Sequence, residues 1–307
     1  MGVGALPVAA LGAFPELQPT SRLAVIAACG IPYLSVPLAG SCGAMVVASR
    51  SRGAKVLWSV ALAAVVAEVS RRWFAPGTPG PTSTADDLTV LSANVLNGRG
   101  DVQQVAALAR GSDLIAIQEC TPAFAEALSA LLATEFPHTV GSSRDGADGT
   151  MVWSRTPLEL MATGHTGFTS VVGVTTVRGI TWTIANVHPL PPQRGSRRWE
   201  DDAQQVLDLV TPHLRENLVV VGDFNAIEEH LTMRRLAATG LRNAMSGWRS
   251  PGVLAWQPSW PTDKAFVPPV IRIDHALHSE SVEAWRPRYI VVTGSDHKAL
   301  LATFRAR

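Results

Sequence analysis

The chain has 307 residues and a formal net charge of +1 at pH 7, with 47% hydrophobic and only 17% charged residues. A charge so close to zero excludes the overall basic field of proteins that track along nucleic acids, so an anionic ligand must be held locally. The three cysteines, Cys29, Cys42 and Cys120, neither pair evenly nor have metal-ligand spacing, which argues against a disulfide framework and a zinc site.

Residues 1–74 form the first predicted region, and their composition indicates two transmembrane helices. From Leu23 to Ser49 the chain carries no charged residue, and at about 1.5 Å per residue this run exceeds the roughly 30 Å hydrocarbon core. A second apolar run is long enough to span the bilayer only if its flanking residues are counted as part of the span. We therefore place the two helices at about 23–49 and 54–73. The alternative is a soluble helical hairpin with one buried face.

The flanks of these runs indicate orientation and the domain boundary. Arg50, Arg52 and Lys55 lie between the two runs, which favours a cytoplasmic loop and an extracytoplasmic location for the rest of the chain. Residues 75–87 have the Pro, Gly and Thr content of an extended linker. We therefore predict a multi-pass protein of the cell membrane, inserted in the lipid bilayer, whose soluble domain occupies residues 88–307. No obligate protein partner is implied.

Short strand-like runs recur in the soluble domain, and helical patterns lie between several of them. The strand-like runs are residues 88–94, 113–119, 150–154, 171–177, 181–188, 218–225, 271–277 and 299–304. Runs that are apolar at every position, such as LVVV at 218–221, must be covered on both faces. The order of elements predicts sheets layered between helices, an α/β or α+β sandwich.

Six segments at or near strand ends finish in Asn, Glu, Asp or His. They are LSAN, IAIQE, TIANVH, VVVGDFN, RID and TGSDH, and they supply Asn94, Glu119, His188, Asp223, Asn225, Asp274, Asp296 and His297. Ligand sites form at such edges because loops present the groups while the sheets fix them. Oxygen ligands without thiolates suit a hard cation such as Mg²⁺ with a phosphate partner. With two histidines for proton transfer, the set indicates phosphoester hydrolysis.

The motifs SAN, IQE, NVH, GDFN, RIDH and SDH, in this order between Leu88 and Phe304, resemble the endonuclease/exonuclease/phosphatase superfamily. These are DNase I-like metal-dependent phosphoesterases, and this chain looks like a membrane-anchored bacterial-type member. The resemblance implies an α+β fold, a four-layered α/β/β/α sandwich of two mixed sheets, here preceded by the N-terminal transmembrane helical hairpin. It also implies a phosphate-ester substrate, either nucleic acid or a lipid head group, and Mg²⁺ or Mn²⁺ as cofactor.

The resemblance assigns the metal ligands and the proton-transfer pair. Glu119 is similar to the family's principal metal ligand, with Asn94 and Asp296 contributing directly or through water. His297 resembles the base that draws a proton from water, and Asp274 the carboxylate that fixes its tautomer.

Three further residues face the phosphate in this resemblance. His188 resembles the histidine that binds the scissile phosphate or protonates the leaving oxygen, although the prolines after it depart from the usual loop. Asp223 and Asn225 resemble the pair that positions the nucleophile and stabilises charge on phosphorus. The attacking water is then activated by His297 or by Asp223.

The substrate is less well defined than the chemistry. Arg194, Arg197 and Arg198 form a basic loop that would hold phosphates and favours a nuclease, unless the loop is ordinary solvated surface. A phospholipid or phosphoinositide phosphodiesterase or phosphatase is the alternative, favoured by the membrane anchor. An inactive binding protein on the same fold is a third hypothesis, and it predicts loss of a catalytic residue. A tryptophan-rich stretch, Trp248, Trp256 and Trp260, would stack on bases, contact lipid or pack in the core.

Overall fold

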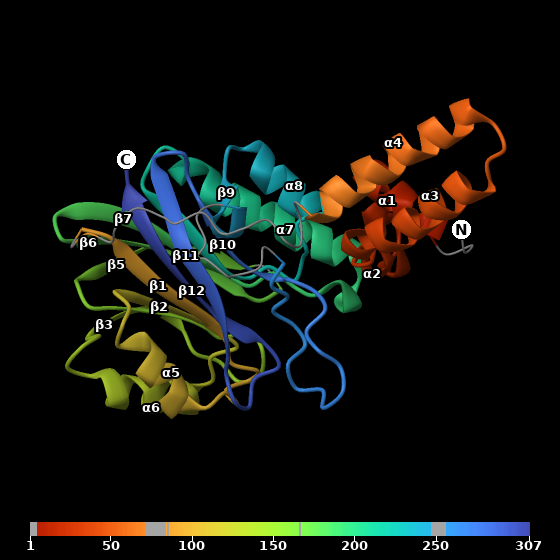
Figure 1. The fold of residues 1–307 in the computed structure, drawn as a ribbon. Helices are drawn as coiled ribbons and strands as arrows, with labels where there is room; N and C mark the ends of the chain where they lie inside the picture. Colours follow the sequence, from red (N-terminus) through yellow and green to blue (C-terminus); the bar gives the residue numbers. More distant parts are fainter. Residues whose placement is uncertain (1–4, 71–83, 85, 166, 247–255) are drawn as a thin grey trace.

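The computed structural model describes residues 5–70, 84, 86–165, 167–246 and 256–307, so Trp248 and most of the predicted linker 75–87 lie outside the described residues. Two six-stranded sheets pack face to face, and the N-terminal helices extend from one end of them (Figure 1). The predicted sandwich of two mixed sheets is confirmed.

The first sheet has the strand order β11-β12-β1-β2-β4-β3. Its only parallel pair among the described strands is β1 with β2, which makes the sheet mixed. The bounds are β1 Leu88–Asn94, β2 Leu114–Gln118, β3 His138–Ser142, β4 Thr150–Ser154, β11 Val282–Val291 and β12 Lys298–Ala306.

The second sheet has the strand order β5-β6-β7-β8-β10-β9 and is also mixed, because β7 and β8 run parallel. The bounds are β5 Leu158–His165, β6 Thr169–Val177, β7 Ile180–Val187, β8 Leu218–Asp223, β9 Arg242–Asn243 and β10 Asp274–His278. Short 3-10 turns complete this half: η4 Pro192–Arg194, η5 Thr211–His213 and η6 Ala244–Ser246.

Alternation along the strands divides the core into three layers. Val90 of β1 and Val221 of β8 face each other's sheets in the central layer. Leu91 packs outward under helices α5 and α6, and Val220 packs outward under α7 and α8. The helices are α5 Val102–Ala109, α6 Pro122–Leu132, α7 Ser196–Val210 and α8 Leu231–Ala238. Both faces of each sheet are therefore covered, as all-apolar strands require.

The N-terminal region divides where one long helix was predicted. Its elements are α1 Ala5–Ala13, η1 Pro15–Thr20, α2 Arg22–Ala28, η2 Ile31–Tyr33, α3 Ser35–Ala48 and α4 Arg52–Val69. In the described part of the chain, no single helix combines the length and hydropathy needed to cross a bilayer. The pair Arg22–Tyr33 and Ser35–Ala48 meets both criteria together but is bent by 58°. Pro32 lies at the break and lacks the N–H that a continuous helix would use.

The first part of this region packs on the catalytic domain. Val25 of α2 is fully buried and belongs to the same core layer as Trp199 and Phe224. Gln18, also fully buried, donates to the carbonyl oxygen of Glu229 and accepts from the backbone N–H of Leu231. Helix α2 is therefore part of the folded domain, whereas α3 and α4 project beyond it as a hairpin (Figure 1).

Strand register brings the polar strand ends to one edge. In the antiparallel pair β8–β10, Asp223 lies opposite Asp274. In the parallel pair β1–β2, Asn94 lies opposite Gln118, so that Glu119 follows at the same edge. Residues far apart in sequence therefore reach one place because their strands are neighbours.

Two backbone positions at this edge adopt conformations that few residues accept. Gly222 has φ +144°, and a Cβ atom there would lie 2.0 Å from the carbonyl oxygen of Val187. Asn225 has φ 47°, in the left-handed region that asparagine tolerates better than most residues. Gly222 and Asn225 thus allow the chain to turn sharply on both sides of Asp223.

His275 lies on the face of β10 opposite to the site, as the strand alternation predicts. It accepts a hydrogen bond from Asn243 Nδ2 at 3.1 Å on Nδ1 and donates from Nε2 to the carbonyl oxygen of Ala226 at 2.8 Å. Burial lowers its pKa to about 4, so the ring is neutral and structural.

Candidate active site

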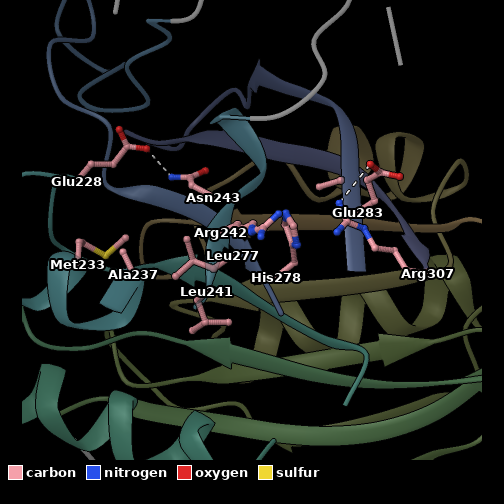
Figure 2. Close-up of a pocket in the computed structure, with 11 residues that line it drawn as sticks. Glu228, Met233, Ala237, Leu241, Arg242, Asn243, Leu277, His278, Glu283 and Arg307 are labelled. Carbon is pink, nitrogen blue, oxygen red and sulfur yellow. Dashed lines mark hydrogen bonds and ion pairs between the residues drawn. The ribbon is translucent and has the colours of Figure 1, made fainter. Parts of the chain in front are cut away.

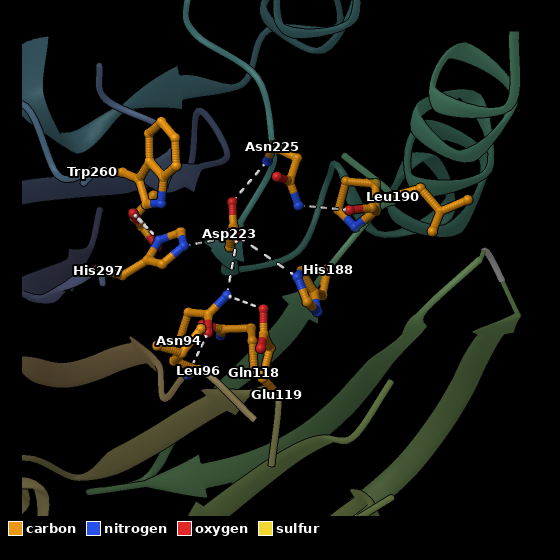
Figure 3. Close-up of polar contacts among 12 residues, drawn as sticks. Asn94, Leu96, Gln118, Glu119, His188, Leu190, Asp223, Asn225, Trp260 and His297 are labelled. Carbon is orange, nitrogen blue, oxygen red and sulfur yellow. Dashed lines mark hydrogen bonds and ion pairs between the residues drawn. The ribbon is translucent and has the colours of Figure 1, made fainter. Parts of the chain in front are cut away.

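Asp223 is at the centre of the polar cluster (Figure 3). Its Oδ1 accepts from the backbone N–H of Asn225 at 2.8 Å, and its Oδ2 lies 3.6 Å from His188 Nε2 and 3.7 Å from His297 Nε2. The carboxylate is 1% exposed. Burial opposes its ionisation, but the two imidazoles outweigh this and lower its pKa below the usual value. Asp223 is therefore ionised at neutral pH.

Asn94 joins the two sheets at this point. Its Nδ2 donates to Asp223 Oδ2 and to Glu119 Oε1, both at 3.1 Å. Glu119 has φ 55° and accepts the backbone N–H of Asn97 at 2.8 Å on its other oxygen. These bonds hold the Glu119 carboxylate at the mouth of the cleft, next to the buried Asp223 carboxylate.

His297 and Asp274 form a buried hydrogen-bonded pair. The Nδ1 of His297 lies 2.9 Å from Asp274 Oδ2, and its Nε2 points towards Asp223. Burial alone would lower the pKa of His297, but Asp274 and Asp223 outweigh it and raise the pKa to about 10. Burial raises the pKa of Asp274, and His297 opposes that rise. These two pKa shifts place the proton shared by Asp274 and His297 on the histidine.

Asp296 supplies the observation that bears on a metal. Its Oδ2 accepts from Trp260 Nε1 at 2.9 Å, whereas its Oδ1 is buried and has no hydrogen-bond partner among the described residues. Buried carboxylate oxygens without a partner are costly, and a cation is one way to satisfy them. Asp296 and Glu119 line the same cleft, so the donors present fit a hard divalent cation.

A second set of donors lies close by. Asp223, Asp274 and His297 offer ligand atoms within 4.8 Å of one another. The direct hydrogen bond between Asp274 and His297 already occupies two of these atoms, and a cation there would have to break it. We therefore favour Glu119, Asn94 and Asp296, which are oxygen donors, as the metal-binding set.

His188 completes the polar end of the cleft. Its ring stacks on Phe168 with centroids 4.7 Å apart and an interplanar angle of 24°. Its backbone N–H donates to Ser170 Oγ at 3.1 Å, and its Nδ1 has no partner among the described residues. The stacked ring presents Nε2 towards Asp223, so His188 can donate to an oxygen bound between them.

The predicted arginines separate in the structure. Arg194, at the end of η4, lines the cleft, whereas Arg197 and Arg198 are exposed on α7 and are not among its lining residues. The three therefore do not form one phosphate-binding group at the site.

Other contributors were missed because single residues of their type carry no sequence signal. Phe168, which stacks on His188, was not predicted at all. Trp260 was singled out for base stacking, lipid contact or core packing, and its hydrogen bond to Asp296 was not predicted. Gln118 donates to Asn186 across the two sheets at 2.6 Å just below the site. Such contacts arise from the packing of distant segments.

A second pocket of about 450 Å³ lies at the other end of β10, around His278 (Figure 2). Its two arginines are paired with carboxylates, Arg242 with Glu280 and Arg307 with Glu283. None of the residues predicted to act on the substrate lines it. Most of the predicted site residues line the larger cleft of about 820 Å³ instead: Glu119, His188, Asp223, Asn225, Asp296 and His297.

The two mixed sheets and the cluster at their shared edge define a DNase I-like phosphoesterase. Residues 91–297 match the Endonuclease/Exonuclease/phosphatase family, and the chain belongs to that family, whose members are hydrolytic phosphoesterases. The N-terminal helices lie outside the matched residues. No curated protein matches the chain at a significant level.

Solved structures agree on the fold. An endonuclease/exonuclease/phosphatase from Beutenbergia cavernae is 17% identical over 72% of each chain, with a TM-score of 0.56. Sphingomyelinase C from Streptomyces griseocarneus is 21% identical over 71% of this chain and 99% of its own, with a TM-score of 0.52. A humanized D. rerio TDP2 is 17% identical over 72% of this chain and 100% of its own, with a TM-score of 0.53. At these identities the likeness establishes the fold alone.

Proposed function

We propose that the chain is a divalent-metal-dependent phosphodiesterase that uses Mg²⁺, with Mn²⁺ as a substitute. The observation that carries this proposal is the surroundings of Asp223. A buried, ionised carboxylate lies between two imidazoles and two amide groups, in one cleft with the carboxylates of Glu119 and Asp296. Such a set can orient a water, receive its proton and hold a phosphate.

Glu119, Asp296 and Asn94 would hold the cation. When bound, it would neutralise charge on the phosphate oxygens as the transition state forms. The support for this placement is Asp296 Oδ1, which is buried, accepts no hydrogen bond from the described residues and lies 3.8 Å from His297 Nε2.

Asp223 is the group we assign to the attacking water. Of the two sequence hypotheses, His297 or Asp223 as base, the raised pKa of His297 and the lowered pKa of Asp223 favour Asp223. As the P–O bond to water forms and the ester P–O bond breaks, Asp223 takes the water's proton. The protonated His297, held by Asp274, stabilises the negative charge that develops. His188 donates to the leaving oxygen, and Asn225 contacts the phosphate.

Glu119 provides the direct test of metal dependence. Full-length wild type should hydrolyse bis-p-nitrophenyl phosphate with Mg²⁺ or Mn²⁺ and lose this activity in EDTA. Glu119→Gln should raise the Mg²⁺ concentration for half-maximal rate by on the order of 10- to 100-fold, since it removes one anionic ligand. Glu126→Gln, an exposed carboxylate on α6, is the matched control. Activity that persists in EDTA, or equal metal dependence in wild type and Glu119→Gln, would contradict the proposal.

We also propose that the hairpin α3–α4 anchors the protein in the cell membrane, with the catalytic domain on the extracytoplasmic side. Neither helix alone has the length and hydropathy needed to cross a bilayer, so the hairpin would insert as a unit. The support is the apolar surface of this hairpin: Val47 is 85% exposed, Leu57 64% and Val60 62%. Arg50 and Arg52 at the tip favour the cytoplasm.

A protease test in intact cells decides the orientation. Protease added outside should cut within residues 75–87, giving two fragments on a denaturing gel, because the contacts of α2 hold them together under native conditions. Cleavage only after lysis would place the domain inside, and recovery of the whole chain in the soluble fraction would reject insertion.

A further inference from the structure

The cleft has an apolar wall as well as its polar end. Ile26 of α2 and Cys29, which follows α2 directly, line the cleft together with Val270, Ile271 and Ile273. Ile26 is 40% exposed and Val270 37%, so part of this apolar surface is open to solvent. A cleft of about 820 Å³ is also larger than a metal ion and one phosphate group require.

Helix α2 is fixed in this position by buried contacts with the catalytic domain. His230, 1% exposed, contacts the carbonyl oxygen of Val25 through Nε2 at 3.1 Å. Arg22 donates to the carbonyl oxygen of Gln193 at 3.3 Å, and the hydroxyl of Tyr33 donates to that of Val270. The N-terminal segment therefore builds one wall of the cleft in addition to any anchoring role.

Charge argues against a polyanion in the same cleft. Among the described residues that line it, Arg194 is the one Arg or Lys. The acidic lining residues are Glu119, Asp145, Asp148, Asp223 and Asp296. A nucleic-acid strand brings many phosphates and needs several cations along its path. A substrate with a single phosphate at the polar end of the cleft does not need several cations.

We propose that the substrate is a lipid phosphodiester whose hydrocarbon chain lies on the wall formed by Ile26 and Val270 while its phosphate lies at Asp223. This inference rests on the proposed phosphodiesterase function and names the substrate class. The same N-terminal segment continues from α2 into the apolar hairpin α3–α4, so one continuous stretch of chain supplies both part of this wall and the proposed membrane anchor (Figure 1). Water is the co-reactant, and the ester P–O bond at phosphorus is the bond that breaks.

Matched synthetic esters test the wall. Methyl and octyl p-nitrophenyl phosphate share one leaving group and differ only in chain length. With the full chain in nanodiscs, kcat/KM should be on the order of 10- to 100-fold higher for the octyl ester, because several methylenes leave water. Ile26→Asn should reduce the octyl-to-methyl ratio about 10-fold. Leu160→Asn, an exposed apolar site on β5 outside the cleft lining and outside the α3–α4 hairpin, should leave the ratio unchanged and so controls for loss of exposed apolar surface alone.

The outcomes separate this inference from the proposed function. Hydrolysis of both esters with a ratio near one would overturn the lipid assignment and leave the phosphodiesterase standing. Faster hydrolysis of thymidine 5′-p-nitrophenyl phosphate than of the octyl ester would also overturn it, in favour of nucleotides. If no ester is hydrolysed, binding of octylphosphonate and methylphosphonate to the protein can be measured by titration instead. Tighter octylphosphonate binding that Ile26→Asn removes, without hydrolysis of any ester, would support the wall and reject the enzyme.

Discussion

Replacement of Asp223 by asparagine is expected to lower kcat for bis-p-nitrophenyl phosphate by on the order of 10³- to 10⁴-fold, with the fold retained. Asparagine keeps the shape of the side chain but removes the charge that His188 and His297 face at 3.6 and 3.7 Å. It also places an amide N–H₂ where an oxygen accepts from Asn94 or Asn225. The variant therefore loses both the proton acceptor and the orientation of its neighbours.

Steady-state kinetics should show a fall in kcat with little change in KM. Single-turnover kinetics would then confirm that the chemical step, and not substrate binding, is slowed. Asp201→Asn is the matched control, since Asp201 is an exposed carboxylate on α7. Thermal unfolding of both variants checks that the fold is intact. A kcat for Asp223→Asn within about tenfold of wild type would remove Asp223 from the role of base.

The prediction of the site from the sequence rested on the polar residues at the strand ends. A strand such as β8 needs apolar residues on both faces, so the sudden change to Gly222, Asp223 and Asn225 marks a functional turn. Asn94 and Asp274 follow the same rule in the neighbouring strands. Pairing of neighbouring strands then brings these residues together with little freedom, which is why the sandwich and the polar cluster were predictable from local patterns.

The wall formed by α2 was not predictable in this way. Val25 and Ile26 lie in an uncharged run whose composition indicated a transmembrane helix, with a soluble buried helix as the alternative. What decides between them is the complementary surface around Trp199 and His230, more than 170 residues later in the chain. Composition measures how apolar a segment is and contains no information about which surface covers it.

The basic loop shows a related effect of local backbone geometry. Arg194 and Arg197 are three residues apart in sequence, yet Arg194 ends the 3-10 turn η4 and Arg197 lies in the first turn of α7. Gly195, with φ +122°, lies between these two elements. Of the three predicted arginines, Arg194 alone is among the described residues that line the cleft, so the support for a nuclease is weaker than the loop alone indicated.

The pair His297 and Asp274 should show strongly non-additive effects. His297→Ala is expected to reduce kcat by on the order of 10²- to 10⁴-fold, since it removes the imidazolium beside Asp223. Asp274→Asn should cause a loss of similar size, because Asp274 holds His297 through a 2.9 Å bond and stabilises its charge. Once His297 is absent, replacing Asp274 removes no further contact with the histidine. The kcat of the double variant should therefore be close to that of His297→Ala alone.

A kinetic cycle of the four proteins measures this coupling directly, with His138→Ala, a partly exposed histidine on β3, as the control. The pH dependence adds a second readout. Loss of Asp274 removes the largest attraction that raises the pKa of His297, so that pKa should fall, and the alkaline limb of the rate profile should move to lower pH in Asp274→Asn. If the two losses multiplied in the double variant, Asp274 would act independently of His297. The buried hydrogen bond between them would then be structural, and Asp274 would need a separate role at the phosphate.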